Sequence, residues 1–318
     1  MKKIFSKRPI IQILATIFTN ANFKGFSEGT IYKGNSKAVC VPGLNCYSCP
    51  GAVGACPIGS LQAVLGGEKY NFSYYIVGIL MLFGVLFGRL ICGFLCPFGF
   101  IQDLLYKIKT PKLKVHEKVD KPLRYLKYLV LLIPVILMTI FLTDQFATAP
   151  PYFCQWICPI GTLEGGIPLI LKSESLRHAV GFLFNWKMFL LILTVVASVF
   201  IYRPFCKYIC PLGALYSLFN KFSFYQMNVD KIKCNSCKAC EKSCKMNVEI
   251  TKCINSLECI RCGECKKVCK QGAINSGFSL KTNKKVYHVS GMGNMENSGQ
   301  KQTCFENEQK PQVNGNEV

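Results

Sequence analysis

Cysteine is the residue type through which this chain could do chemistry. The 318-residue sequence contains 20 cysteines and only three histidines. One cysteine-containing heptapeptide occurs four times, as CPIGSLQ (56–62), CPFGFIQ (96–102), CPIGTLE (158–164) and CPLGALY (210–216). Deprotonated thiols are ligands for soft metal centres. The pattern predicts metal or redox chemistry, and we identify no paired catalytic carboxylates, nucleophile constellation or phosphate-binding loop, so no residue is assigned a catalytic role.

Two further cysteine runs follow the last heptapeptide, CNSCKACEKSC (234–244) and CIRCGECKKVC (259–269). Both have the C-x2-C-x2-C-x3-C spacing of bacterial two-cluster ferredoxins, in which the fourth cysteine of each run binds the other cluster. The resemblance covers about 232–276 and implies two [4Fe–4S] clusters. The implied ligand sets are Cys234, Cys237, Cys240 and Cys269 for one cluster, and Cys259, Cys262, Cys265 and Cys244 for the other. Lys245 and Lys270 stand where ferredoxins usually have proline. Zinc and disulfides are the alternatives, but structural zinc takes two pairs of ligands and disulfides are rare in the cytoplasm.

Each heptapeptide offers half of a cluster site. Three of them have a second cysteine four residues upstream, which gives the pairs Cys92/Cys96, Cys154/Cys158 and Cys206/Cys210. In the first repeat Cys56 has Cys49 seven residues upstream, with Cys46 as a rival. Two repeats must therefore meet to supply four thiolates. The proline after each cysteine suits the first turn of a helix. Four cysteines are left over: Cys40, Cys46, Cys253 and Cys304.

Long apolar stretches predict the elements that position these cysteines. The chain is 50% apolar, with a mean hydropathy of +0.27. We expect spans at 9–23, 72–91, 123–142 and 181–202, with a kink at Pro134, because each stretch approaches the ~20 residues that cross a bilayer. A signal peptide is the alternative for the first. The apolar pieces after the first and third repeats are too short to span and are expected to be re-entrant or interfacial.

The predicted fold is mainly α. A small transmembrane helical bundle, of about four spans plus short re-entrant helices, occupies 1–221. An α+β two-cluster ferredoxin-like domain follows at 222–276, and a disordered tail at 277–318.

The predicted topology decides which repeats meet. The short, lysine-rich loop 103–122 should stay in the cytoplasm, together with the N-terminus and the ferredoxin-like domain. The second and fourth repeats then share an inner cluster, and the first and third share an outer one. The expected inner ligands are Cys92, Cys96, Cys206 and Cys210, and the expected outer ligands are Cys49, Cys56, Cys154 and Cys158. For the outer four, structural thiols or disulfides are the alternative.

The net charge is +21. Because the basic residues cluster beside the apolar stretches, we attribute this charge to the orientation of membrane helices and not to nucleic-acid binding. Arg89 is expected to extend to the lipid headgroups. Asp103, Glu117 and Asp144 are interpreted as ordinary helix-end or loop charges. Clusters on opposite faces of a ~30 Å hydrocarbon core would be too far apart for one fast electron transfer, although re-entrant placement of the outer cluster shortens this gap. We therefore expect a partner subunit or bound quinone near Arg89.

The segments CGFLCPFGFIQ and CKYICPLGALY, each placed after a span and followed by the ferredoxin runs, resemble the NapH/NosR/CcoG-like membrane polyferredoxins over about 74–276. The resemblance implies a multi-pass protein of a prokaryotic plasma membrane. Such proteins pass electrons between a quinone pool or cytoplasmic donor and a redox partner, which can be a ferredoxin, a flavoprotein or a reductase subunit. This chain would be one electron-transfer subunit of an oxidoreductase complex. A redox sensor or a metalloenzyme maturation factor is the alternative, and a metal-ion transporter is a weaker one.

Overall fold

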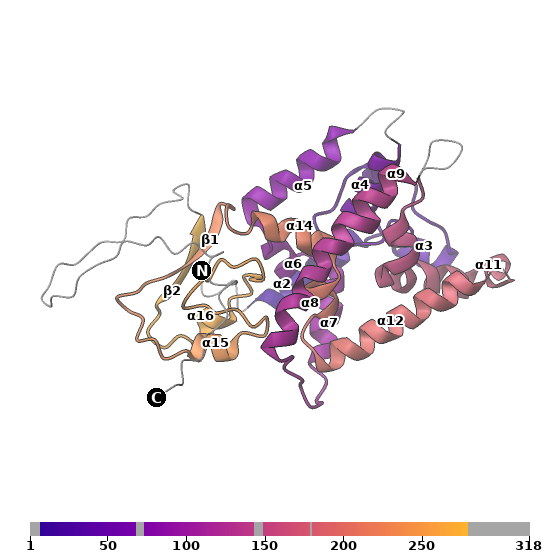
Figure 1. Cartoon of the computed structure of the whole chain (residues 1–318). Coiled ribbons are helices and arrows are strands. Elements are labelled where there is room, and N and C mark those ends of the chain that lie inside the picture. Colours follow the sequence, from indigo (N-terminus) through magenta and orange to yellow (C-terminus); the bar gives the residue numbers. More distant parts are fainter. Residues whose placement is uncertain (1–6, 68–72, 143–148, 179, 279–318) are drawn as a thin grey trace, which may run out of the picture.

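The computed structural model describes residues 7–67, 73–142, 149–178 and 180–278. The predictions for Asp144, Cys304 and the tail beyond residue 278 lie outside these ranges. Within them the chain is mainly helical, and its two strands lie together at one end of the molecule (Figure 1).

The repeat-bearing part consists of short and medium-length helices. Its first half contains α2 (Arg8–Thr19), α3 (Phe23–Glu28), the 3-10 helix η1 (Asn35–Ala38), α4 (Pro57–Gly66), α5 (Tyr74–Phe87), α6 (Leu90–Phe94) and α7 (Pro97–Tyr106). Its second half contains α8 (Glu117–Val130), the π-helix η2 (Leu131–Leu137), α9 (Met138–Phe141), the π-helices η3 (Phe153–Ile157) and η4 (Gly161–Gly166), α10 (Ile167–Lys172), α11 (Glu174–His178), α12 (Phe182–Phe200), α13 (Pro204–Tyr208) and α14 (Pro211–Phe219). Pro134 lies inside η2, so the expected distortion is a change from α to π winding.

A helix begins within each heptapeptide, as its proline led us to expect. Cys56, Cys96 and Cys210 are the N-cap residues of α4, α7 and α14, and each has an extended backbone. The following proline occupies the first helical position, where its missing N–H costs no hydrogen bond. In the third repeat, helical structure likewise begins at Pro159. The second cysteine of each pair is therefore held beside the N–H groups of a helix N-terminus.

Two helical segments within the described residues are long and apolar enough to cross a membrane. They are Glu117–Phe141, formed by α8, η2 and α9, and Phe182–Phe200, which is α12. The other two expected spans are shorter, since α2 has 12 residues and α5 has 14. At 1.5 Å per residue, α5 is about 21 Å long. A bundle of four full spans is therefore not established by the structure.

The two long segments leave most of their apolar side chains uncovered. In the most apolar 18-residue stretch of each segment, the share of residues buried inside the molecule is 17% for Glu117–Phe141 and 11% for Phe182–Phe200. On α12, Phe189, Ile192 and Leu193 are each more than half exposed. Such surfaces in contact with water would be unfavourable, whereas lipid tails would cover them without cost. The exposed helices therefore support a membrane location.

The C-terminal module pairs the strand β1 (Tyr225–Val229) antiparallel with β2 (Ile274–Phe278), in the register Tyr225↔Phe278. Two short helices, α15 (Ala239–Ser243) and α16 (Glu264–Val268), follow the starts of the two cysteine runs. The predicted α+β character is thus present. The expected tail begins too early, because residues 277 and 278 belong to β2 and pair with β1.

Candidate iron–sulfur sites

The two ferredoxin-like runs fold in the same way. Left-handed backbone occurs at three equivalent pairs of positions: Ser236 and Arg261, Lys238 and Gly263, and Asn247 and Gly272. The first two pairs lie between successive cysteines of each run, and the third pair follows the last cysteine. The periodic sequence therefore produces two loops of similar backbone conformation.

The first predicted set surrounds a cavity of about 340 Å³. Its lining includes the four predicted cysteines, Cys234, Cys237, Cys240 and Cys269. Cys237 is exposed, so this cavity lies at the surface of the module. Four thiols around one small cavity are a donor set that fits a [4Fe–4S] cluster.

The second predicted set is also gathered in one place. Burial raises the pKa of the Cys265 thiol. Three neighbouring thiols raise it further: Cys259, Cys262 and Cys244. The four thiols are therefore near enough to repel one another when deprotonated, and coordination to iron would relieve this repulsion.

The second and fourth heptapeptides meet in the repeat-bearing part. Burial raises the pKa of the Cys96 and Cys210 thiols, and the charges of Cys206 and Cys92 raise both further. We call these four cysteines the inner group. The backbone N–H of Gly213 donates to Cys210 Sγ at 3.2 Å, so a helix N-terminus does face a sulfur here.

The first and third heptapeptides meet as well. Burial raises the pKa of the Cys154 thiol, and three neighbouring thiols raise it further: Cys158, Cys56 and Cys46. We call Cys46, Cys56, Cys154 and Cys158 the outer group. The sulfur of Cys46 lies close to the glycine of the third repeat, 3.8 Å from where a Cβ on Gly161 would stand.

Cys49, the expected outer ligand, lies in a different environment. Its thiol donates to the Asn20 side chain at 3.6 Å. Burial raises its pKa, and the charged side chains that perturb it most are Glu164 and Lys37. The structure thus groups the rival Cys46 with Cys56, Cys154 and Cys158. Every cysteine in the four groups, as well as Cys49, is a free thiol.

The inner and outer groups are close neighbours. Segment 43–46 lies between them: a Cβ on Gly43 would stand 2.9 Å from Cys96 Cα. The backbone amide of Leu44 lies beside the Cys96 thiol and partly offsets the rise in its pKa, and the next amide, of Asn45, does the same for the Cys56 thiol. Successive residues are 3.8 Å apart, which puts the two sulfurs within about 12 Å. The two groups are therefore separated by much less than the ~30 Å thickness of a hydrocarbon core.

The C-terminal module is docked directly on the inner group. A Cβ on Gly93, the residue after Cys92, would lie 2.5 Å from the carbonyl oxygen of Ile260. Ile260 is the residue after Cys259, so ligand-bearing loops of the two parts are in backbone contact. Only glycine allows an approach this close.

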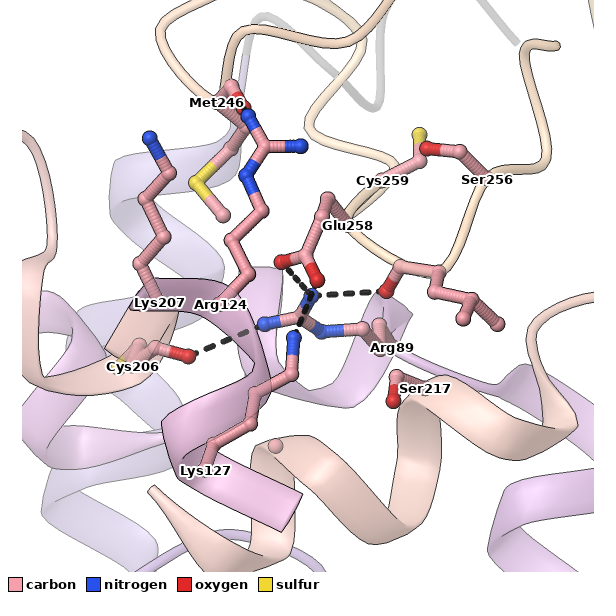
Figure 2. A network of polar contacts seen from close by, with 12 residues as sticks. Arg89, Arg124, Lys127, Cys206, Lys207, Ser217, Met246, Ser256, Glu258 and Cys259 are labelled. Carbon is pink, nitrogen blue, oxygen red and sulfur yellow. Dashed lines mark hydrogen bonds and ion pairs between the residues drawn. The ribbon is translucent and has the colours of Figure 1, made fainter. Parts of the chain in front are cut away.

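A buried charge network holds this interface together, as Figure 2 shows. Glu258, beside Cys259, pairs with Arg89 at 2.9 Å and also with Lys127. Arg89 donates in addition to the Leu257 carbonyl at 2.8 Å and the Cys206 carbonyl at 3.1 Å. Arg89 is fully buried. It therefore does not extend to lipid headgroups.

A second buried charge network lies on the other side of the inner group. Arg203 donates to Asp103 through two bonds, of 2.7 and 2.6 Å, and to the Cys92 carbonyl at 2.5 Å. Arg8 donates to the same carboxylate at 2.5 Å. Although burial alone would raise the pKa of Asp103, these arginines lower it to about 2. The interpretation of Asp103 as an ordinary charge is wrong, whereas Glu117 does lie in the first turn of α8.

Lys245 has a structural partner that explains its departure from the ferredoxin pattern. Its ammonium lies 5.5 Å from the centre of the Tyr106 ring and 5.4 Å from that of Tyr202. Both tyrosines belong to the repeat-bearing part. The lysine that replaces proline thus forms cation–π contacts across the interface. Lys270, at the equivalent position of the second run, is exposed.

Sequence reasoning missed the side chains that act between repeats. The last residue of the heptapeptide is Gln, Gln, Glu or Tyr in the four copies. Gln62 donates to Cys154 Sγ at 3.6 Å and Gln102 donates to Cys206 Sγ at 3.1 Å. Glu164 accepts from the Cys46 amide at 2.7 Å. The repetition of a glutamine at this position in two copies was the available signal.

Two leftover cysteines within the described residues, Cys40 and Cys253, belong to none of the four groups. Cys40 is buried and forms an isolated parallel bridge with Ala55. Cys253 lies in the loop between the two cysteine runs, where its amide donates to the Glu249 carbonyl. In the described ranges, three or more His, Cys, Asp or Glu side chains do not converge on a position for a single metal ion.

Comparison with known proteins supports iron–sulfur binding. A family model described as a 4Fe–4S binding domain matches residues 72–116, 128–172 and 185–226. The uncharacterized protein MJ0749 of Methanocaldococcus jannaschii is 34% identical over 72% of this chain and 80% of its own length. No solved structure matches the chain.

Two more distant relatives have descriptive names. The methylamine utilization ferredoxin-type protein MauN of Methylorubrum extorquens is 27% identical over 60% of this chain and 55% of its own length. The regulatory protein NosR of Stutzerimonas stutzeri is 25% identical over 51% of this chain, but over only 21% of its own length. The resemblance predicted from the doubled C-x3-C-P motif is confirmed, and the chain belongs to the 4Fe–4S binding family that includes these ferredoxin-type proteins.

Proposed function

We propose that this protein is a membrane-bound electron carrier with four [4Fe–4S] clusters in one continuous series. The order along the series is the cavity group (Cys234, Cys237, Cys240 and Cys269), the second ferredoxin group (Cys244, Cys259, Cys262 and Cys265), the inner group and the outer group. When bound, such clusters accept and release electrons one at a time. The protein's part is to hold the four sites close together and to shield the last two from water.

The observation that carries the proposal is the direct contact at each junction. The first two groups exchange ligands, since Cys269 lies at the end of one run and Cys244 at the end of the other. Gly93 joins the second ferredoxin group to the inner group. The amides of Leu44 and Asn45 join the inner group to the outer group. Electrons then need no mid-membrane carrier between the inner and outer groups.

The two ends of the series differ in their exposure. Cys237 is exposed, and lysines such as Lys238 and Lys270 surround that cavity. A soluble redox protein with acidic residues around its own cofactor would fit this end by charge complementarity. The other end, at the outer group, would face a second redox partner. We propose a protein partner rather than a quinone beside Arg89, because Glu258 and two carbonyls occupy that guanidinium.

The orientation follows from the same contacts. The lysine-rich loop between α7 and α8 lies against the C-terminal module, where Lys114 and Lys245 line one small cavity. A strongly basic short loop stays in the cytoplasm. We therefore propose that the module is cytoplasmic and that electrons enter or leave there.

The test is the metal content of the full chain purified anaerobically in detergent. Four clusters require about sixteen irons per chain, and stepwise reduction should produce four EPR-active species. A content of about eight irons would limit metal to the ferredoxin-like module and refute the series. The chain could instead contain about sixteen irons but show no electron exchange between the ferredoxin-like module and the inner and outer clusters. That result would favour the redox-sensor alternative.

A further inference from the structure

Two buried glutamines point their amide nitrogens at sulfurs of the membrane-part groups. Gln102 lies on α7 and donates through Nε2 to Cys206 Sγ at 3.1 Å. Gln62 lies on α4 and donates through Nε2 to Cys154 Sγ at 3.6 Å. Their exposed fractions are 1% and 0%. Both bonds cross from one heptapeptide to the paired heptapeptide.

The two bonds are equivalent in position. Each glutamine is the seventh residue of its repeat, and each target is the first cysteine of the partner's C-x3-C-P pair. In both cases the target follows a phenylalanine, Phe153 or Phe205. The other two repeats use this position differently: Glu164 accepts from the Cys46 amide, and the Tyr216 hydroxyl donates to the Pro42 carbonyl. Each group thus receives one side-chain donor from this position of the heptapeptide.

The remaining contacts distinguish the two glutamines. Gln62 has a structural use in addition, because its Oε1 accepts from the Phe153 amide at 3.1 Å. The Oε1 of Gln102 is buried without a partner among the described residues, so its amide is held mainly through the nitrogen. A buried amide is unfavourable unless its hydrogen bonds are made. The short Gln102 bond to sulfur is therefore the main polar contact that justifies this side chain.

We propose that Gln102 and Gln62 set the reduction potentials of the inner and outer clusters. This inference rests on the proposed function. A donor N–H stabilises the reduced cluster more than the oxidised one, because reduction adds negative charge that the sulfurs share. Each glutamine therefore raises the potential of its own cluster. The effect is larger for Gln102, since its donor is closer to the sulfur. The glutamines are positioning residues that bind no iron themselves.

The experiment is an EPR-monitored redox titration of the full chain carrying Gln102→Met or Gln62→Met. Methionine preserves length and burial but removes the donor. For Gln102→Met we expect the reduction equilibrium of the inner cluster to become about tenfold less favourable, which equals 59 mV for one electron. Gln62→Met should shift only the outer cluster, and by less. Each variant serves as the control for the other.

The outcomes separate this inference from the function on which it depends. Four clusters with unchanged potentials in Gln102→Met would overturn the inference and leave the electron carrier intact. An iron content of about eight in the native chain would refute the carrier itself. If Gln102→Met lost the inner cluster, the titration would be repeated on Gln102→Leu, whose apolar side chain has a different shape. Loss in both variants would show that the glutamine holds the group together instead of tuning it, and would also overturn the inference.

Discussion

The C-terminal module and the repeat-bearing part each gather eight cysteines into two groups, but they do so by different means. In the module, each run supplies three ligands within seven residues, and local left-handed turns bring them together. In the repeat-bearing part, each repeat supplies only two, and partners such as Cys96 and Cys206 are 110 positions apart. Local spacing is sufficient for the first arrangement, whereas the second depends on helix packing and on buried charges.

The difference also concerns solvent. Cys237 of the module is exposed, while Cys206 and Cys210 of the inner group are each only 3% exposed. An exposed site suits exchange with a soluble partner, and a buried one suits transfer inside the protein. The comparison predicts that changes at the interface or in the packed helices affect stability more than equivalent changes on the module's surface.

The largest effect is expected for Glu258→Gln. The substitution leaves Arg89 and Lys127 buried without their counter-charge, which should destabilise the docked structure by about 3–5 kcal/mol. Thermal unfolding and protease sensitivity of the module measure this loss. Glu249→Gln is the matched control, because that carboxylate pairs with Lys252 at the surface, where both side chains are about half exposed or more. A surface pair contributes at most about 1 kcal/mol, so equal effects of the two substitutions would contradict the account.

Asp103→Asn should have the next largest effect. The pKa of Asp103 falls from 3.8 to about 2 in the folded protein, which corresponds to about 2 kcal/mol. A lowered carboxylate pKa stabilises the folded state above the unfolded pKa, and this stabilisation is lost as the pH falls through the folded value. The variant should therefore unfold at a lower temperature than the native chain at pH 7. The difference in unfolding temperature between the variant and the native chain should narrow below about pH 4 and disappear near pH 2. A gap that is independent of pH would show that the arginines do not act through this carboxylate.

Gly93→Ala tests the backbone contact between the two parts. The added Cβ would lie 2.5 Å from the Ile260 carbonyl, and overpacking of this kind costs about 1–3 kcal/mol. We expect a lower unfolding temperature and slower electron exchange between the module and the inner group, with the iron content unchanged. Gly78→Ala on α5 is the control, because a Cβ there meets no described atom within 4 Å. If Gly93→Ala behaved like this control, the direct junction would be disproved.

The smallest effect is expected for Lys245→Ala, which removes cation–π contacts with Tyr106 and Tyr202 worth about 0.5–2 kcal/mol. Chemical denaturation of the full chain can resolve a change of this size. Lys270→Ala, at the equivalent exposed position of the second run, should be neutral. A neutral result for both would mean that Lys245 replaces the ferredoxin proline for a reason other than docking.

The parts of this fold that depend on neighbouring residues could be predicted from the sequence. The spacing of the ferredoxin-like runs gave two loops of the same form, and the Cys-Pro pairs predicted helix starts at Pro57, Pro97 and Pro211. The pairing of alternate repeats followed from charge asymmetry around apolar stretches. Each of these patterns is local, or depends only on successive loops lying on alternate sides of the membrane.

The missed features all depend on contacts between distant segments. Cys46 and Cys49 are both plausible by spacing, and only the path of segment 43–46 against Cys96 brings Cys46 to the outer group. Arg89 has the sequence context of a lipid-facing residue, yet Glu258, 169 positions later, buries it. The close approach of the inner and outer groups likewise depends on segment 43–46, whose path between them the apolar stretches do not indicate.

The most direct test of the four-cluster series is the magnetic interaction between the inner and outer clusters in the fully reduced chain. Two paramagnetic clusters whose ligand sulfurs lie within about 12 Å should broaden or split each other's EPR signals. We predict that Cys46→Ser removes about four irons and abolishes this interaction, while Cys49→Ser retains both. Independent, unbroadened signals in the native chain, or loss of the outer cluster in Cys49→Ser but not in Cys46→Ser, would contradict the account.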